Sequence, residues 1–106
     1  MQQITPNELN RRLQQDSPAP LLLDVREPIE FNYCHIEGST SMPMSQVFLG
    51  LNTLDPEQET VVICHHGMRS AQVANFLISH GFKHISNLAG GVAAWARDVD
   101  PTMPTY

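Results

Sequence analysis

The stretch Thr60-Val61-Val62-Ile63-Cys64-His65-His66-Gly67-Met68-Arg69-Ser70 decides the fold, because it joins a buried strand to a helix through a short loop. Its β-branched start predicts a strand over 60–64. A helix is predicted over 70–80, with His80 in its last turn and Gly81 as the left-handed cap. The apolar stripe of this helix consists of Ala71, Ala74, Leu77 and Ile78.

The same alternation of strand and helix extends to both sides of this stretch. Strands are predicted at 21–25, more weakly at 83–88, and as short segments at 3–4 and 39–42. Helices are predicted after the N-cap Thr5 and over 91–97. Buried strands that alternate with helices favour an α/β architecture, with a mainly parallel sheet covered on both faces.

Length and composition bound the remaining possibilities. A chain of 106 residues is expected to form a single domain over 1–106, with the proline-containing 101–106 as a frayed tail. A hydrophobic share of 42% excludes a disordered chain. A net charge of -5 with a single lysine disfavours binding to nucleic acid or to anionic membranes. Because no apolar run could span a bilayer and 1–6 lacks signal-peptide features, we expect a cytoplasmic protein with free thiols.

The loop after Cys64 has the features of a nucleophile's anion cradle. Gly67 permits a sharp turn, and a short loop that enters a helix leaves backbone N–H groups unpaired. These donors favour an ionised thiol, and the fork of Arg69 suits an oxyanion. We therefore predict that Cys64 is a catalytic thiol, although a buried, inert cysteine is the alternative. The predicted substrate-binding residues are His65, His66, Gly67, Met68 and Arg69.

Four segments in this order resemble the motifs of one known family, the rhodanese-like domains. Leu23-Asp24-Val25-Arg26-Glu27 looks like its Asp-Val-Arg segment, and Phe31 followed by His35-Ile36-Glu37-Gly38-Ser39 is similar to its aromatic…His-Ile-Pro-Gly-Ala motif. The loop from Cys64 to Ser70 resembles its Cys-x-x-Gly-x-Arg-Ser loop. The segment Leu88–Trp95 resembles its closing Gly-Gly-x-x-x-Trp motif.

This resemblance implies a three-layer α/β/α domain with a five-stranded, mainly parallel sheet. It also implies a ping-pong sulfurtransferase in which Cys64 forms a persulfide. The implied donor is thiosulfate or a persulfide, and the implied acceptor is a nucleophile such as cyanide or a thiol. No metal and no organic cofactor are implied.

Two alternatives remain open at this point. The domain could be a persulfide carrier or interaction module that serves a protein donor or acceptor. It could also be a phosphatase, because related phosphatases share this fold. Those phosphatases have one more residue between cysteine and arginine. The shorter spacing of Cys64 and Arg69 fits a single sulfur better than a phosphate. A metal site is disfavoured because the adjacent His65 and His66 point in different directions.

Several further residues carry expectations of their own. His65 stands where many active members have arginine or lysine, so we expect weaker attraction for thiosulfate and a rate that rises as the pH falls below about 6.5. Asp24 and Arg26 end a strand on the same edge as Cys64, where Arg26 could add positive potential to the site, but a supporting ion pair, with Arg26 reaching Glu30, is favoured. Cys34 is interpreted as a bystander rather than a resolving thiol.

Overall fold

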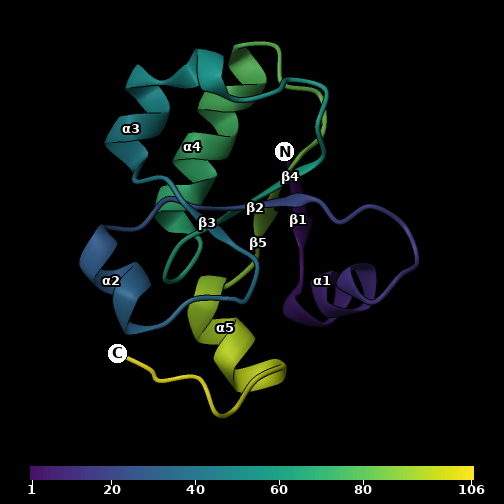
Figure 1. Cartoon of the computed structure of the whole chain (residues 1–106), viewed down its shortest axis with the longest axis vertical. Coiled ribbons are helices and arrows are strands. Elements are labelled where there is room, and N and C mark those ends of the chain that lie inside the picture. Colours follow the sequence, from purple (N-terminus) through teal and green to yellow (C-terminus); the bar gives the residue numbers. More distant parts are fainter.

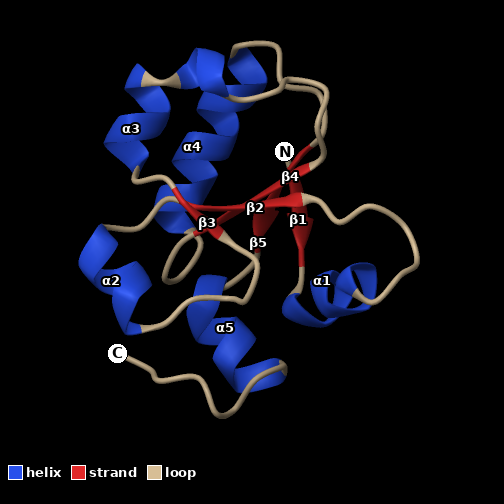
Figure 2. Ribbon diagram, in the orientation of Figure 1, coloured by secondary structure: helices blue, strands red, loops and turns tan.

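The computed structural model describes residues 1–106 and contains one five-stranded sheet, with strand order β1-β5-β4-β2-β3 (Figure 2). All strand pairs are parallel. The predicted α/β class with a five-stranded, mainly parallel sheet is therefore confirmed. The strands are β1 (Gln2–Ile4), β2 (Leu21–Asp24), β3 (Thr40–Ser41), β4 (Thr60–Ile63) and β5 (Ile85–Leu88).

Helices cover both faces of the sheet (Figure 1). The helices are α1 (Pro6–Leu13), α2 (Pro28–Tyr33), α3 (Met44–Leu49), α4 (Met68–Ser79) and α5 (Gly91–Asp98), with a short 3-10 helix η1 (Leu51–Thr53). α1 contacts α5 on one side of the sheet, and α3 contacts α4 on the other. This arrangement gives the three layers that the strand and helix pattern predicts.

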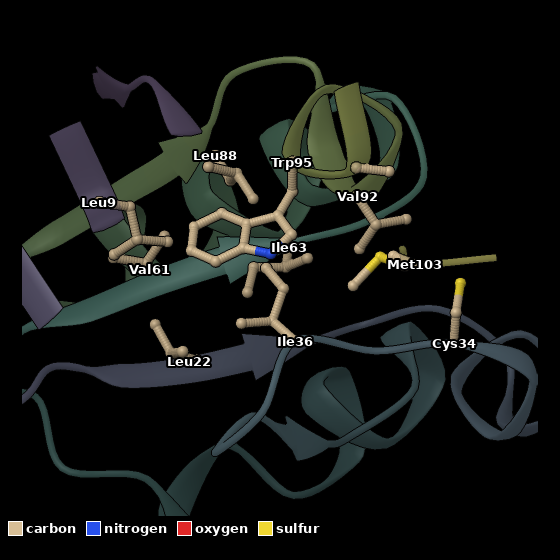
Figure 3. Close-up of a cluster of buried hydrophobic side chains, with 11 residues drawn as sticks. Leu9, Leu22, Cys34, Ile36, Val61, Ile63, Leu88, Val92, Trp95 and Met103 are labelled. Carbon is tan, nitrogen blue, oxygen red and sulfur yellow. The ribbon is translucent and has the colours of Figure 1, made fainter. Parts of the chain in front are cut away.

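Alternate residues of the central strand β4 face opposite layers. Val61 and Ile63 belong to a hydrophobic cluster with Leu9 of α1 and Trp95 of α5, which Figure 3 shows. Val62 belongs to the second cluster, on the side of α4. The strand is completely buried because both of its faces are covered. This placement puts the residue after β4, Cys64, at the carboxyl edge in the middle of the sheet.

Local sequence signals account for several element boundaries. Thr5 and Glu8 form the two reciprocal bonds of a capping box at the start of α1, with the Glu8 N–H donating to Thr5 Oγ1 at 3.2 Å. Gly81 follows α4 with φ +90°, as predicted. The α4 helix begins at Met68 rather than at Ser70, so the loop after Cys64 is shorter than expected. None of the helices is both long and apolar enough to cross a membrane.

The segment 101–106 packs against the rest of the chain, whereas a frayed tail was expected. Met103 belongs to the core cluster that contains Trp95. The Tyr33 hydroxyl donates to the Thr105 carbonyl at 3.2 Å, and Tyr106 makes two further hydrogen bonds. Pro101 and Pro104 end the helical pattern, but they do not prevent the chain from packing back along α2.

Candidate active site

The loop between β4 and α4 surrounds the thiol of Cys64. Cys64 is only 1% exposed. The Gly67 N–H donates to Cys64 Sγ at 3.1 Å, and the Ser70 hydroxyl lies 3.2 Å from the same sulfur. Gly67 has φ +101°, a left-handed conformation that turns the chain directly into α4. The Cys64 sulfur therefore lies close to both the Gly67 amide and the start of α4.

The start of α5 supports the back of the loop. Val92 N–H donates to the Cys64 carbonyl at 2.9 Å, and Ala93 N–H donates to the His65 carbonyl at 3.1 Å. Gly91 allows this close approach, because a Cβ on Gly91 would lie 2.3 Å from the Cys64 carbonyl oxygen. Both carbonyls thus point towards α5, away from the thiol.

Amide donors line the opposite side of the loop. The N–H groups of His65 and His66 donate to no protein acceptor. Met68, Arg69 and Ser70 form the first turn of α4, where N–H groups have no partner within the helix. Such a concave set of donors attracts a small anion. The predicted cradle is therefore formed by backbone amides, while the side chain of Met68 is 79% exposed.

Ser70 of α4 and Asn87 of β5 form a buried polar pair that contacts the loop after Cys64. Asn87 donates its side-chain amide to the Gly67 carbonyl and to Gln3 Oε1, both at 3.1 Å. Its amide oxygen consequently faces the hydroxyl of Ser70, with which it is hydrogen-bonded. Ser70 and Asn87 are not among the site residues predicted from the sequence. The available signal was a polar Asn87 beside Leu88 in a predicted strand, where a sheet covered on both faces would bury it.

Arg69 forms an ion pair with the Glu30 carboxylate, so its charge is not left free for an anion in the loop. Its Nη1 donates to Glu30 Oε1 at 2.7 Å, and its Nη2 donates to Glu30 Oε2 at 2.9 Å. The bonds to Arg69 lower the pKa of Glu30 to about 2, against the opposing effect of burial. The pair is thus charged on both sides throughout the neutral range.

Arg26 forms its ion pair with Asp24, and both side chains are completely buried. The expected pairing of Arg26 with the Glu30 side chain is not found, since Arg26 reaches only the Glu30 carbonyl, at 3.4 Å. Burial opposes the charge of Arg26, but bonds to Asp24 and Tyr106 keep its pKa above the ordinary value. Neither Asp24 nor Arg26 forms a hydrogen bond with the 64–69 loop.

Tyr106 covers the outer side of the loop. Its ring stacks on His65 with centroids 3.9 Å apart and an interplanar angle of 8°. Its hydroxyl accepts from Arg26 Nη1 at 2.9 Å and donates to Glu30 Oε2 at 2.7 Å. Burial, followed by the neighbouring His66, lowers the pKa of His65. Burial likewise raises the pKa of Tyr106 to about 12.

The other candidate groups lie apart from the thiol. Cys34 is free and buried, and it belongs to the core cluster on the α5 side, whereas Cys64 belongs to the opposite cluster. No three His, Cys, Asp or Glu side chains come together as metal ligands would. Trp95 lies in the core, as Figure 3 shows. The chemistry available at the site is that of a buried thiol with amide donors around it.

Comparison with known proteins identifies relatives along the whole chain. A family model for the rhodanese-like domain matches residues 5–98. The chain is 33% identical over 105 residues to the thiosulfate sulfurtransferase GlpE of Haemophilus influenzae, covering 98% of this chain and 96% of that protein. It is 43% identical over 89 residues to rhodanese-like/PpiC domain-containing protein 12, chloroplastic, of Arabidopsis thaliana. That match covers 80% of this chain and 30% of the plant protein's length.

A solved structure has the same fold. The rhodanese-related protein of Thermoplasma volcanium superimposes with a TM-score of 0.84 at 30% sequence identity. The match covers 93% of this chain and 94% of that one. Together with the matched family model, this establishes that the chain belongs to the rhodanese-like domain family.

Proposed function

We propose that this protein is a sulfurtransferase that carries a sulfane sulfur as a persulfide on Cys64. The observation that carries the proposal is the Gly67 N–H bonded to Cys64 Sγ at 3.1 Å, within a loop whose next amides have no protein acceptor. The family and its sulfurtransferase relatives support this class of reaction.

The proposed reaction has two half-reactions. The Cys64 thiolate attacks the outer sulfur of a donor such as thiosulfate, the donor's S–S bond breaks, and sulfite leaves with the electron pair. A nucleophilic acceptor such as cyanide then attacks the outer sulfur of Cys64–S–S⁻ and takes it as thiocyanate, which restores the thiolate. The amides of His65, His66, Gly67 and Met68 stabilise the negative terminal sulfur between the two steps.

The remaining loop residues have supporting roles in this proposal. Arg69, held by Glu30, fixes the start of α4 and thereby the direction of the first amides of the helix. Asp24 and Arg26 support the fold behind α2 rather than contacting the donor. The five-position spacing from Cys64 to Arg69 favours sulfur over phosphate, which disfavours a phosphatase.

A carrier role for a protein partner is a second candidate. It is favoured by the Arabidopsis relative, in which the matched segment is 30% of a longer protein. In that case the outer sulfur of Cys64 would pass to a thiol of another domain or protein. Both candidates need the same persulfide on Cys64.

Steady-state kinetics with thiosulfate and cyanide test the proposal. We expect thiocyanate formation with parallel double-reciprocal lines, as a ping-pong mechanism requires. Cys64→Ser should abolish turnover, and the matched variant Cys34→Ser should retain it. Turnover by Cys64→Ser at the wild-type rate would exclude Cys64 as the sulfur carrier.

A further inference from the structure

We propose that the preferred sulfur donor is an organic persulfide rather than thiosulfate, because the cations around the Cys64 loop are already neutralised and an apolar pocket lies beside them. This inference rests on the proposed function, since it takes Cys64 as the sulfur-accepting thiol. It concerns which donor the loop selects.

Arg69 offers no net charge to a donor. Its guanidinium is paired through two bonds with the Glu30 carboxylate, whose side chain is 18% exposed. Glu30 also accepts from the Tyr106 hydroxyl at 2.7 Å, so the carboxylate is held in place from two sides. A dianion that approached Arg69 would meet this carboxylate as well, and the two negative charges would repel each other.

Arg26 has no donor left for a ligand. Its Nε and Nη2 bond to Asp24, Nη2 also donates to the Cys34 carbonyl at 2.7 Å, and Nη1 donates to Tyr106 and to the Glu30 carbonyl. The side chain is 0% exposed. A guanidinium has five N–H donors, and these contacts use all of them. Arg26 therefore organises its surroundings but does not bind the donor.

His65 is held in its neutral form near pH 7. Its ring stacks on Tyr106, and burial is the main cause of its lowered pKa. His66 and Arg26 also disfavour the charge, whereas Glu30 and the Tyr106 backbone favour it, and the first set prevails. At this position the loop thus presents an uncharged ring to an incoming donor. A fixed cation would be needed there to attract thiosulfate strongly.

These pairings leave no unpaired arginine at the donor site. Thiosulfate arrives as a dianion and releases sulfite, a second dianion, next to the new persulfide. An ionised organic persulfide carries a single charge on its terminal sulfur, which the loop amides can bind. Placing an uncompensated dianion in a half-buried site is the more unfavourable of the two.

An apolar pocket beside the ion pair suits the organic part of such a donor. The pocket has a volume of about 260 Å³ and is lined by Ile29, Glu30, Tyr33 and Tyr106. Ile29 is 79% exposed and Tyr33 is 54% exposed, so apolar surface is available there. Glu30 and Tyr106 link this pocket directly to Arg69 and His65. Thiosulfate has no apolar group with which to use it.

The transfer balances without any further reagent. The Cys64 thiolate attacks the outer sulfur of R–S–S⁻, the S–S bond of the donor breaks, and R–S⁻ leaves with the electron pair. The proton lost by the Cys64 thiol is taken up by the departing thiolate. The net change is R–S–S⁻ plus Cys64–SH to R–SH plus Cys64–S–S⁻, with no oxidant or reductant consumed.

Single-turnover sulfuration of Cys64 by three donors tests this inference. The donors are thiosulfate, benzyl persulfide, and a short uncharged peptide whose cysteine carries a persulfide. Each rate constant is divided by the rate constant of the same donor with free N-acetylcysteine. This division corrects for differences in the donors' intrinsic reactivity towards a thiol. We expect the two organic persulfides to exceed thiosulfate by about tenfold or more, the value of one charge-assisted hydrogen bond. A faster peptide assigns a protein source, and a faster benzyl donor assigns a small molecule.

Glu30→Gln should leave the charge of Arg69 unpaired. The ratio of the Cys64 sulfuration rate with thiosulfate to that with persulfide should then rise by about tenfold. Glu57→Gln is the matched control, because it removes the same charge from an exposed pair with Lys83 that does not involve the loop. Should Glu30→Gln fold poorly, His65→Arg adds a fixed cation within the loop and should shift the ratio in the same direction.

The outcomes separate this inference from the proposed function. Sulfuration of Cys64 by thiosulfate as fast as by the persulfides, after normalisation, overturns the donor preference and leaves the sulfurtransferase intact. A ratio that neither Glu30→Gln nor His65→Arg moves also overturns it. No sulfuration of Cys64 by any of the three donors would instead contradict the proposed function.

Discussion

Arg69 gives both terminal nitrogens of its guanidinium to the carboxylate of Glu30, at 2.7 and 2.9 Å. The pair connects the first turn of α4 with α2, two elements that are 39 residues apart at these positions. Because the geometry is bidentate, it fixes the orientation of both side chains. Arg69 is therefore a positioning residue for the loop, and its charge is neutralised at the place where a donor arrives.

The pair predicts an acid-sensitive part of the stability. The pKa of Glu30 lies at about 2, below its ordinary value of 4.5, so the contribution is complete above pH 4.5 and is lost as the pH falls towards 2. The difference in unfolding free energy between wild type and Glu30→Gln should shrink over this window. Urea unfolding at a series of pH values measures it, with Glu57→Gln as the control. An equal difference at both ends of the window contradicts the assignment.

Ser70 is predicted to stabilise the sulfur anion. Its hydroxyl lies 3.2 Å from Cys64 Sγ and donates its one proton to the Asn87 amide oxygen. When Cys64 ionises, rotation of the hydroxyl turns this proton to the sulfur anion, so Ser70→Ala should remove a charge-assisted bond and slow persulfide formation by about tenfold. Ser79→Ala is the matched control, because Ser79 lies at the far end of the same helix and donates to the Phe76 carbonyl. Stopped-flow single turnovers provide the rates. Equal rates for Ser70→Ala and Ser79→Ala would exclude the role.

Gly91 is predicted to be the least replaceable glycine of the site. A Cβ there would lie 2.3 Å from the Cys64 carbonyl oxygen and 2.4 Å from the His65 carbonyl oxygen. Gly91→Ala should therefore destabilise the fold by about 3 kcal/mol, from overpacking and backbone strain together. Gly81→Ala, where φ is also positive but no atom lies within 4 Å, should cost only about 1 kcal/mol. Urea midpoints of equal value for the two variants would refute the close approach.

Tyr106 is predicted to keep His65 uncharged. Tyr106→Ala removes the stacked ring, relieves the burial of His65 and should raise its pKa towards 6.5. Tyr106→Phe keeps the ring and loses only the hydroxyl, so it should shift the His65 pKa less. NMR titration of the His65 ring protons distinguishes the two variants. A His65 pKa that is the same in wild type and Tyr106→Ala would rule out the shielding.

The parts of the fold that depend on local patterns were predictable. The strands β2 and β4 each contain three consecutive apolar residues, and α1 and α4 carry a capping signal or an apolar stripe. The loop from Cys64 to Arg69 was predicted because its chemistry lies within six consecutive residues. The helices α2 and α3 were not predicted as such. Each has six residues, and α2 buries none, so no helical period is visible.

The long-range contacts of the site could not be predicted from local patterns. Glu30 lies one helical turn from Arg26, which favoured that pair, but the buried Asp24 occupies Arg26 and leaves Glu30 to Arg69. Tyr106 follows two prolines, which favoured a frayed tail, yet it contacts Arg26 across 80 residues of sequence. Asn87 reaches the loop only because β5 lies beside β4. Each of these contacts depends on the order of strands in the sheet.

The mass of the intact protein after incubation with a sulfur donor tests the central claim most directly. We predict an adduct of one sulfur atom that peptide mapping places on Cys64, that cyanide removes as thiocyanate, and that is absent from Cys64→Ser but present in Cys34→Ser. An adduct that maps to Cys34, or one that persists in Cys64→Ser, would contradict the account.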